Sequence, residues 1–125
     1  MESWSVVKEV TIHTIQLMPN NPDHIFVCTK SSQAYLMTTH GQLIRTYSSG
    51  KQEGGDFVCA TVSPQGKFVY CVGEDGILYA FDVAGGQLEN VLQISDREVI
   101  GLTHHPMQSI VATITDDGQL KLWKP

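Results

Sequence analysis

Histidines and cysteines are the residues with which this 125-residue chain could bind a metal ion or catalyse a reaction. Of the five histidines, only His104 and His105 are adjacent. Neighbouring residues of a strand point to opposite faces of a sheet, so these two side chains cannot readily share a metal ion. Core hydrogen bonding or packing at a strand end is the simpler interpretation of both. The histidines therefore indicate neither a metal site nor a catalytic base.

Two Asp-Gly pairs and one glycine-rich segment offer other kinds of chemistry. Asp75 and Asp117 could form an acid pair, but they stand at equivalent points of two similar segments, where capping a turn is explanation enough. Segment 50–55 superficially suggests a phosphate cradle. It lacks the Gly-Lys-Ser/Thr ending at P-loop spacing and is not followed by a helix whose N-terminus would complete such a site. We therefore expect no catalytic, metal or cofactor site.

Cysteine usage and the chain start point to an intracellular protein. Cys28, Cys59 and Cys71 are odd in number, lack CxxC spacing and lie within apolar runs, which favours small buried thiols in a reducing compartment. The first residues have neither a basic start followed by an apolar core nor an arginine-rich amphipathic pattern, so we expect no export signal. No apolar run reaches the length of a membrane span. We expect no membrane partner.

Charge is distributed unevenly along the chain. The net charge is −5, and ten of the thirteen acidic residues lie within 53–125. An acidic surface repels phosphate backbones, and no cluster of Lys and Arg with interleaved aromatic residues is present in the sequence. Direct binding of nucleic acid is therefore not expected.

An internal repeat provides the framework that positions these residues. Two segments superpose without a gap at an offset of 42 residues. The matching landmarks are Ser63-Pro64 with His105-Pro106, Asp75-Gly76 with Asp117-Gly118, and Phe81 with Trp123. A weaker upstream copy matches through Met18-Pro19 and through Gly41-Gln42-Leu43, at an offset of 45. We place the repeats at about 6–49, 50–93 and 94–125.

Each copy predicts four short strands. In the middle copy they cover about 57–63, 67–73, 76–82 and 87–93, separated by turn residues. Gly76 and Gly118 each follow an aspartate between two apolar runs. An Asp-Gly pair in this position is the strongest local signal for a hairpin, because aspartate and glycine both tolerate positive φ. Phe81 and Trp123 are the expected aromatic residues of the blade core.

The first two strands of a copy are apolar almost throughout. An antiparallel strand without alternation is buried on both faces, so each small sheet must lie between neighbouring sheets. A sandwich of two sheets would leave its outer faces in water and should show cleaner alternation. We therefore predict an all-β fold over residues 1–125, with about three four-stranded antiparallel blades of a partial β-propeller.

Three blades are too few to close a propeller ring. The last copy stops at Pro125, directly after its third strand. The expected partners therefore include either remaining blades, if the chain is a fragment, or further copies of the chain that assemble with it.

The repeat resembles the WD40 repeat in its period, its four strands, its Asp-Gly turn and the Trp that follows. The segments 48–59, 70–75, 96–106 and 120–125 further resemble the last three repeats of the suppressor-of-mec-and-unc WD40 splicing factor family, and the likeness covers about Val10 to Pro125. The Trp-Asp signature survives only as Met37-Thr38, Phe81-Asp82 and Trp123-Lys124. Ser95 stands where a buried histidine normally bonds the turn aspartate, here Asp117, so we expect that turn to lack one partner.

This resemblance implies a nuclear, spliceosomal protein that acts in pre-mRNA splicing. Members of the family combine an N-terminal LisH-type helical region with a seven-bladed propeller and work with a partner called RED, which binds mainly the helical region. The resemblance thus implies spliceosomal protein partners, with RED among the candidates.

One end of the predicted blades is the candidate partner-binding surface. Loop 50–55 joins the outer strand of one blade to the inner strand of the next, which places it on the same propeller face as the Asp-Gly turns. We name this surface the acidic rim; its residues are Lys51, Glu53, Asp56, Glu74, Asp75, Arg97, Glu98, Asp116 and Asp117. We expect it to dock a basic segment of a partner, and the alternative is a merely solvated loop face.

The predicted function is a protein-binding scaffold and not an enzyme. A propeller-type hydrolase or metal-dependent enzyme is the first alternative, and convergent histidines and acids on the innermost strands would indicate it. A self-assembling repeat fragment is the second. Fold alone does not separate these functions, because propellers have many.

Overall fold

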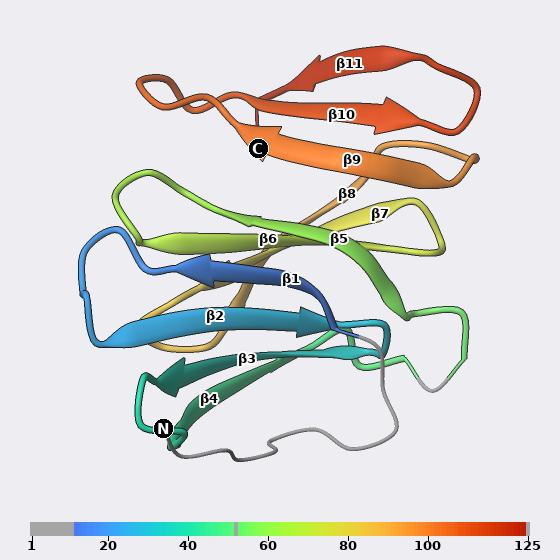
Figure 1. The fold of residues 1–125 in the computed structure, drawn as a ribbon. Coiled ribbons are helices and arrows are strands. Elements are labelled where there is room, and N and C mark those ends of the chain that lie inside the picture. The colour runs from blue at the N-terminus through green and yellow to red at the C-terminus, as the bar shows by residue number, and fades with distance from the viewer. Residues whose placement is uncertain (1–11, 52, 125) are drawn as a thin grey trace.

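A computed structural model describes residues 12–51 and 53–124 (Figure 1). Its strands are β1 (Ile12–Leu17), β2 (His24–Thr29), β3 (Gln33–Thr38), β4 (Leu43–Ser48), β5 (Phe57–Val62), β6 (Phe68–Gly73), β7 (Ile77–Asp82), β8 (Leu88–Gln93), β9 (Val99–His104), β10 (Val111–Thr115) and β11 (Leu120–Trp123). They form antiparallel sheets in the orders β1-β2-β3-β4, β5-β6-β7-β8 and β9-β10-β11. We name these sheets blade 1, blade 2 and blade 3. The predicted all-β class is confirmed, and the strands predicted in the middle copy agree with β5 to β8 within one residue.

The turn glycines show why the repeat folds as hairpins. Gly76 and Gly118 have φ values of 76° and 85°, in the left-handed region that favours glycine. A Cβ on Gly76 would collide with the carbonyl oxygen of Ser95, whereas one on Gly118 would meet nothing within 4 Å. Gly76 therefore serves both the turn and the close approach of the chain that enters blade 3.

The three blades are stacked, with blade 2 in the middle (Figure 1). One apolar core lies between blades 1 and 2, where Tyr47 packs on Phe81 with ring centroids 5.5 Å apart. A second core lies between blades 2 and 3 and includes Tyr70, Val99 and Val111. Strands β5, β6 and β7 are buried along most of their length, so both faces of blade 2 are covered. This is the arrangement that their unbroken apolar sequences predict.

The inner strands and the outer strands differ in their surroundings. β5 contacts β1 and β9 of the neighbouring blades, which places these three strands on the inner side of the stack. β8 is exposed along almost all of its length and forms an outer edge. Trp123 of β11 is partly buried against the second core, and its indole N–H donates to Thr113 Oγ1 at 3.0 Å.

The face of blade 3 that points away from blade 2 is apolar and open. Ile114, Leu120 and Leu122 share this face through the β10–β11 register, and all three are exposed. Leu120 and Leu122 keep 68% and 67% of their surface in solvent. Among the described residues, no helix is long and apolar enough to cross a membrane.

A candidate protein-binding rim

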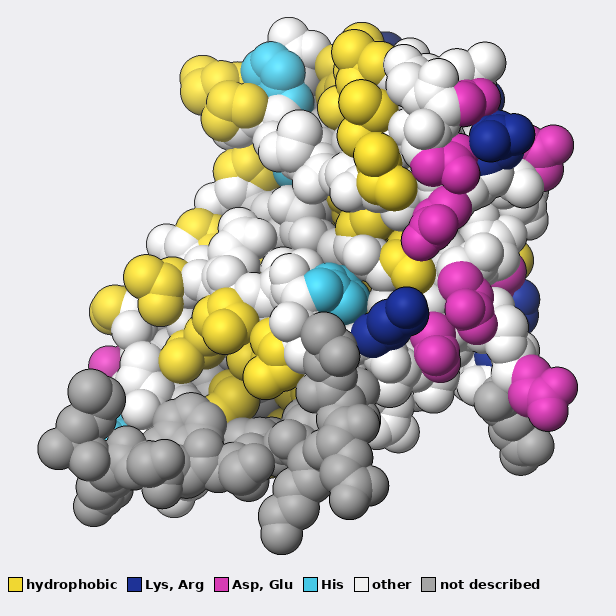
Figure 2. Space-filling model, turned by 45° about the vertical axis from the view of Figure 1, so that its right-hand side comes forward, with side chains coloured by type: hydrophobic (Ala, Val, Ile, Leu, Met, Phe, Trp, Pro, Cys, Tyr) yellow, Lys and Arg dark blue, Asp and Glu magenta, His cyan; other side chains and the backbone are white. Residues whose placement is uncertain are grey.

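The acidic rim lies at one end of the blades, where the inter-blade loops meet the Asp-Gly turns. One main-chain hydrogen bond holds each loop to its turn: Glu74 N donates to the Asp56 carbonyl at 2.7 Å, and Asp116 N donates to the Glu98 carbonyl at 3.0 Å. The two bonds are equivalent, since their residues differ by the 42-residue repeat. Figure 2 shows acidic and basic side chains gathered along this edge of the molecule.

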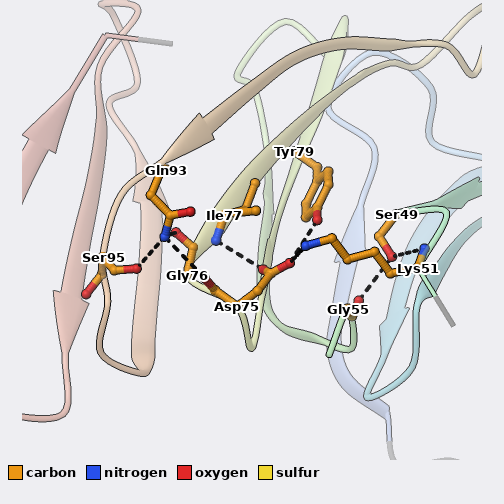
Figure 3. Close-up of polar contacts among 9 residues, drawn as sticks. All are labelled: Ser49, Lys51, Gly55, Asp75, Gly76, Ile77, Tyr79, Gln93 and Ser95. Carbon is orange, nitrogen blue, oxygen red and sulfur yellow. Dashed lines mark hydrogen bonds and ion pairs between the residues drawn. The ribbon is translucent and has the colours of Figure 1, made fainter. Parts of the chain in front are cut away.

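Asp75 is the centre of the blade 2 part of the rim (Figure 3). Its carboxylate forms an ion pair with Lys51 Nζ, and it accepts hydrogen bonds from Tyr79 Oη at 3.0 Å and from Ile77 N at 3.1 Å. The bond from Ile77 is the local Asx contact that aspartate makes in turns. Partial burial would raise the pKa of Asp75, but these three donors lower it below the usual value of an aspartate.

Main-chain carbonyls around Asp75 are bound by a second group of side chains (Figure 3). The amide of Gln93 donates to the Asp75 carbonyl at 3.2 Å and to the Ser95 carbonyl at 2.7 Å. The Ser49 hydroxyl donates to the Gly55 carbonyl at 3.2 Å and accepts from Lys51 N. The loop and the turn are thus tied together at several points. Sequence reasoning missed Gln93, Ser49 and Tyr79.

Blade 3 repeats this arrangement with different residues. Arg97 Nε donates to Asp116 Oδ1 at 3.0 Å and lies 3.3 Å from Asp117 Oδ2. Asp117 also accepts from the Thr115 hydroxyl and from Gln119 N. The hydrogen bond from Thr115 is the main reason why the pKa of Asp117 lies below its usual value. Thr115 and Arg97 therefore bind the turn aspartate, and Ser95 forms no hydrogen bond to it among the described residues.

The rim has a negative net charge. Seven of its nine residues are acidic, and both cations, Lys51 and Arg97, are engaged in ion pairs with rim aspartates. Glu53, Glu74 and Glu98 are exposed, and none of them takes part in an ion pair within residues 12–51 and 53–124. The acidic charge is therefore presented to solvent. This arrangement can attract and orient a cationic segment.

The other residues considered for chemistry have structural contacts. His104 stacks on Tyr70 with ring centroids 5.5 Å apart, and His105 Nδ1 accepts from Met107 N and Gln108 N in the β9–β10 turn. No three potential metal ligands gather at one point in the part of the chain that the structure describes.

Comparisons with known proteins identify the class of the fold. The described blades resemble the WD40 repeats of RRP9, with a TM-score of 0.82 and 16% identity over 94% of this chain and 36% of that one. They also resemble the β-propeller domain of Cps50 (Swd1) from Myceliophteria thermophila, with a TM-score of 0.78 and 15% identity over 91% of this chain and 40% of that one. The chain therefore consists of WD40-type β-propeller blades.

The sequence points to a particular relative within this class. The chain is 38% identical over 119 residues to WD40 repeat-containing protein smu1 of Dictyostelium discoideum. The match covers 94% of this chain, which spans 22% of the length of that relative. The family resemblance predicted from the sequence is thereby confirmed. No protein-family model matches the chain.

Proposed function

We propose that this chain is a non-enzymatic protein-interaction scaffold that presents the acidic rim to a basic segment of a partner. The observation that carries the proposal is the rim itself, where both cations are held in ion pairs and three glutamates are exposed. Because hydrogen bonds and ion pairs hold each loop to its turn, the rim loses little conformational entropy when a partner binds. The inner strands β1, β5 and β9 give no support to a hydrolase. They contain no aspartate or glutamate, and their two histidines have structural contacts: His13 with the Phe57 carbonyl and His104 with the ring of Tyr70.

The biological setting of the proposal is pre-mRNA splicing in the nucleus, with spliceosomal proteins as partners and RED among the candidates. The family resemblance supports this part. Affinity purification of the tagged protein from nuclear extract, with the proteins that copurify identified by mass spectrometry, tests it. We expect spliceosomal proteins to be enriched over a tag-only control, and their absence would contradict the splicing role.

Charge reversal tests the rim directly. We expect the double variant Glu53→Lys, Glu74→Lys to bind a fluorescein-labelled decalysine peptide about tenfold more weakly than the unmodified chain, because opposite charge at the rim attracts the probe. Fluorescence anisotropy at low salt measures the affinity. Binding should also weaken as salt is raised, because the rim is exposed to screening.

The matched control carries Asp23→Lys and Glu89→Lys, which change the net charge by the same amount away from the rim. Both residues are exposed. We expect this control to bind the peptide much as the unmodified chain does. Equal weakening in the two variants would show that overall charge, and not the rim, attracts the probe, and would overturn the proposal.

A second candidate function is association with a further sheet through the open face of blade 3. The exposed side chains of Ile114, Leu120 and Leu122 favour it, because this face is equivalent to the covered face of blade 2. We propose that the face is covered by a further blade, supplied by remaining blades of the ring or by a second copy of the chain.

A further inference from the structure

A cavity of about 490 Å³ lies between blade 2 and the β9–β10 turn. It is bordered by the β5–β6 turn, so it lies at the opposite end of the blades from the acidic rim. Its lining includes Phe68, Tyr70, Ala80, Asn90, His104 and Met107. Its size falls within the range of natural ligand pockets.

The hollow has a local cause in the packing of blade 2. Tyr70, Ala80 and Asn90 pair in register and form one row across β6, β7 and β8. At the equivalent position of blade 3, one repeat later, the chain has Leu122. The small side chain of Ala80 leaves space between its two larger neighbours.

Aromatic rings form one wall of this space. Tyr70 stacks on His104 with an interplanar angle of 25°, and Phe68 continues the row at a centroid distance of 6.4 Å from Tyr70. Met107 stands at the mouth with 87% of its surface exposed, and methionine adapts readily to different apolar shapes. The interior of the cavity therefore suits an apolar side chain.

Tyr70 is a buried polar side chain without an internal partner. Only 5% of its surface is exposed, and its hydroxyl forms no hydrogen bond within residues 12–51 and 53–124. Among the described residues, the only side-chain polar atom that is fully buried and lacks a hydrogen bond is Arg45 Nε. The Tyr70 hydroxyl lacks a hydrogen bond but is not such an atom, so it reaches solvent. Tyr70 lines the cavity, so its hydroxyl is open to a ligand there. A phenol hydroxyl can donate a hydrogen bond, so a ligand in the cavity can take the place of water at this group.

The mouth of the cavity indicates what kind of ligand carries the apolar group. It offers the amides of Gln65, Asn90 and Gln108, together with one cation, Lys67, and one anion, Glu89. Amides pair well with the carbonyl and N–H groups of a peptide main chain. Charges of both signs complement a peptide with mixed flanking charges better than an anion or a cation alone.

We propose that this cavity is a second partner-binding site, which takes an extended peptide segment of a partner protein with a leucine-sized side chain placed over Ala80. The Tyr70 hydroxyl donates to a main-chain carbonyl of that segment. This site is separate from the acidic rim and does not depend on it.

Two capped tripeptides test the proposal: acetyl-Ala-Leu-Ala-amide and, as its polar counterpart, acetyl-Ala-Asp-Ala-amide. Amide chemical shifts of the ¹⁵N-labelled chain are followed by NMR during titration. We expect the leucine probe to bind with a dissociation constant on the order of 1 mM and to shift the amides of residues around Tyr70, Ala80 and His104. The aspartate probe should shift them far less. Equal shifts with both probes, or none up to about 10 mM, would overturn the site.

Variants of the chain make the test specific. Ala80→Leu fills the hollow and should weaken binding of the leucine tripeptide at least tenfold. Tyr70→Phe keeps the ring but removes the hydroxyl, and should weaken binding several-fold. Thr46→Leu, an exposed substitution on β4, is the matched control and should leave binding unchanged. If Ala80→Leu fails to melt cooperatively, Met107→Ala replaces it and should weaken binding several-fold. Undiminished binding by a folded filled-cavity variant contradicts the proposal.

The two proposals fail separately. The rim variant Glu53→Lys, Glu74→Lys should bind the leucine tripeptide as the unmodified chain does. Loss of tripeptide binding in that variant would show that the cavity is not an independent site.

Discussion

At the scale of single residues, Asp75 shows how one carboxylate links two segments. It receives hydrogen bonds from Lys51, Ile77 and Tyr79, which belong to the inter-blade loop and to β7. These donors favour the charged form, so the folded chain holds a proton on Asp75 less tightly than the unfolded chain does.

This difference predicts the pH dependence of stability. The contribution of Asp75 is fully present above its unfolded pKa of 3.8 and is lost as the pH falls through the lower folded pKa. We expect Asp75→Asn to be less stable than the unmodified chain at pH 7, with the difference shrinking toward about pH 2. Urea denaturation across this pH range measures it. Glu74→Gln is the control, because it replaces an exposed neighbouring carboxylate that forms no ion pair within residues 12–51 and 53–124.

Cys28, Cys59 and Cys71 are free and buried, as the apolar runs around them predict. Burial raises the pKa of Cys59 to about 12, and its thiol donates to the Val99 carbonyl at 3.1 Å. A protonated, enclosed thiol is a poor nucleophile. We expect no labelling of Cys59 by Ellman's reagent at pH 8 in the folded chain, and labelling of all three cysteines in guanidinium chloride. Fast labelling of Cys59 in the native chain would contradict its enclosure.

At the scale of elements, the Asp-Gly turns of blades 2 and 3 have the same φ sign and different surroundings. Gly118→Ala should cost about 1 kcal/mol, the cost of a left-handed conformation alone. Gly76→Ala should cost clearly more, because the added Cβ also meets the Ser95 carbonyl. Chemical denaturation of the two variants measures the difference. Equal losses would show that the chain entering blade 3 moves aside without cost.

The blade core provides a second comparison between elements. Phe81 is 1% exposed; its ring contacts Tyr47 across the interface with blade 1 and Phe57 within blade 2. Leu88 on the outer strand is 45% exposed. We expect Phe81→Ala to lower the free energy of unfolding by about 3–5 kcal/mol and Leu88→Ala by less than about 1 kcal/mol. Urea denaturation measures both. Similar losses would contradict the packing of blade 1 against blade 2.

At the scale of the whole molecule, the open face of blade 3 determines how the chain associates. If copies cover this face, light scattering at micromolar concentration should show a mass above that of one chain. Leu120→Glu with Leu122→Glu should then return the chain to a monomer, because each buried leucine contributes about 2 kcal/mol of apolar burial. A stable monomer of the unmodified chain would exclude self-association and leave a further blade as the occupant of this face.

Much of the architecture follows from local sequence patterns. Strand and turn positions depend on residues that are close in sequence, such as Asp75 and Gly76 between two apolar runs, so they could be predicted within one residue in the middle copy. The absence of alternation in β5 and β6 likewise predicted burial on both faces, since neither face can be left in water. The order of the loops likewise predicted which residues belong to the rim.

The tertiary structure alone decided which of these groups meet. Lys51 and Asp75 pair because the inter-blade loop turns back onto the β6–β7 hairpin, and Gln93 joins them from an outer strand. The cavity over Ala80 likewise depends on the relative size of side chains brought together by register and stacking. Local propensities determine how a chain of this kind folds into blades, whereas side-chain pairing and cavities arise from long-range packing, which no short stretch of sequence contains.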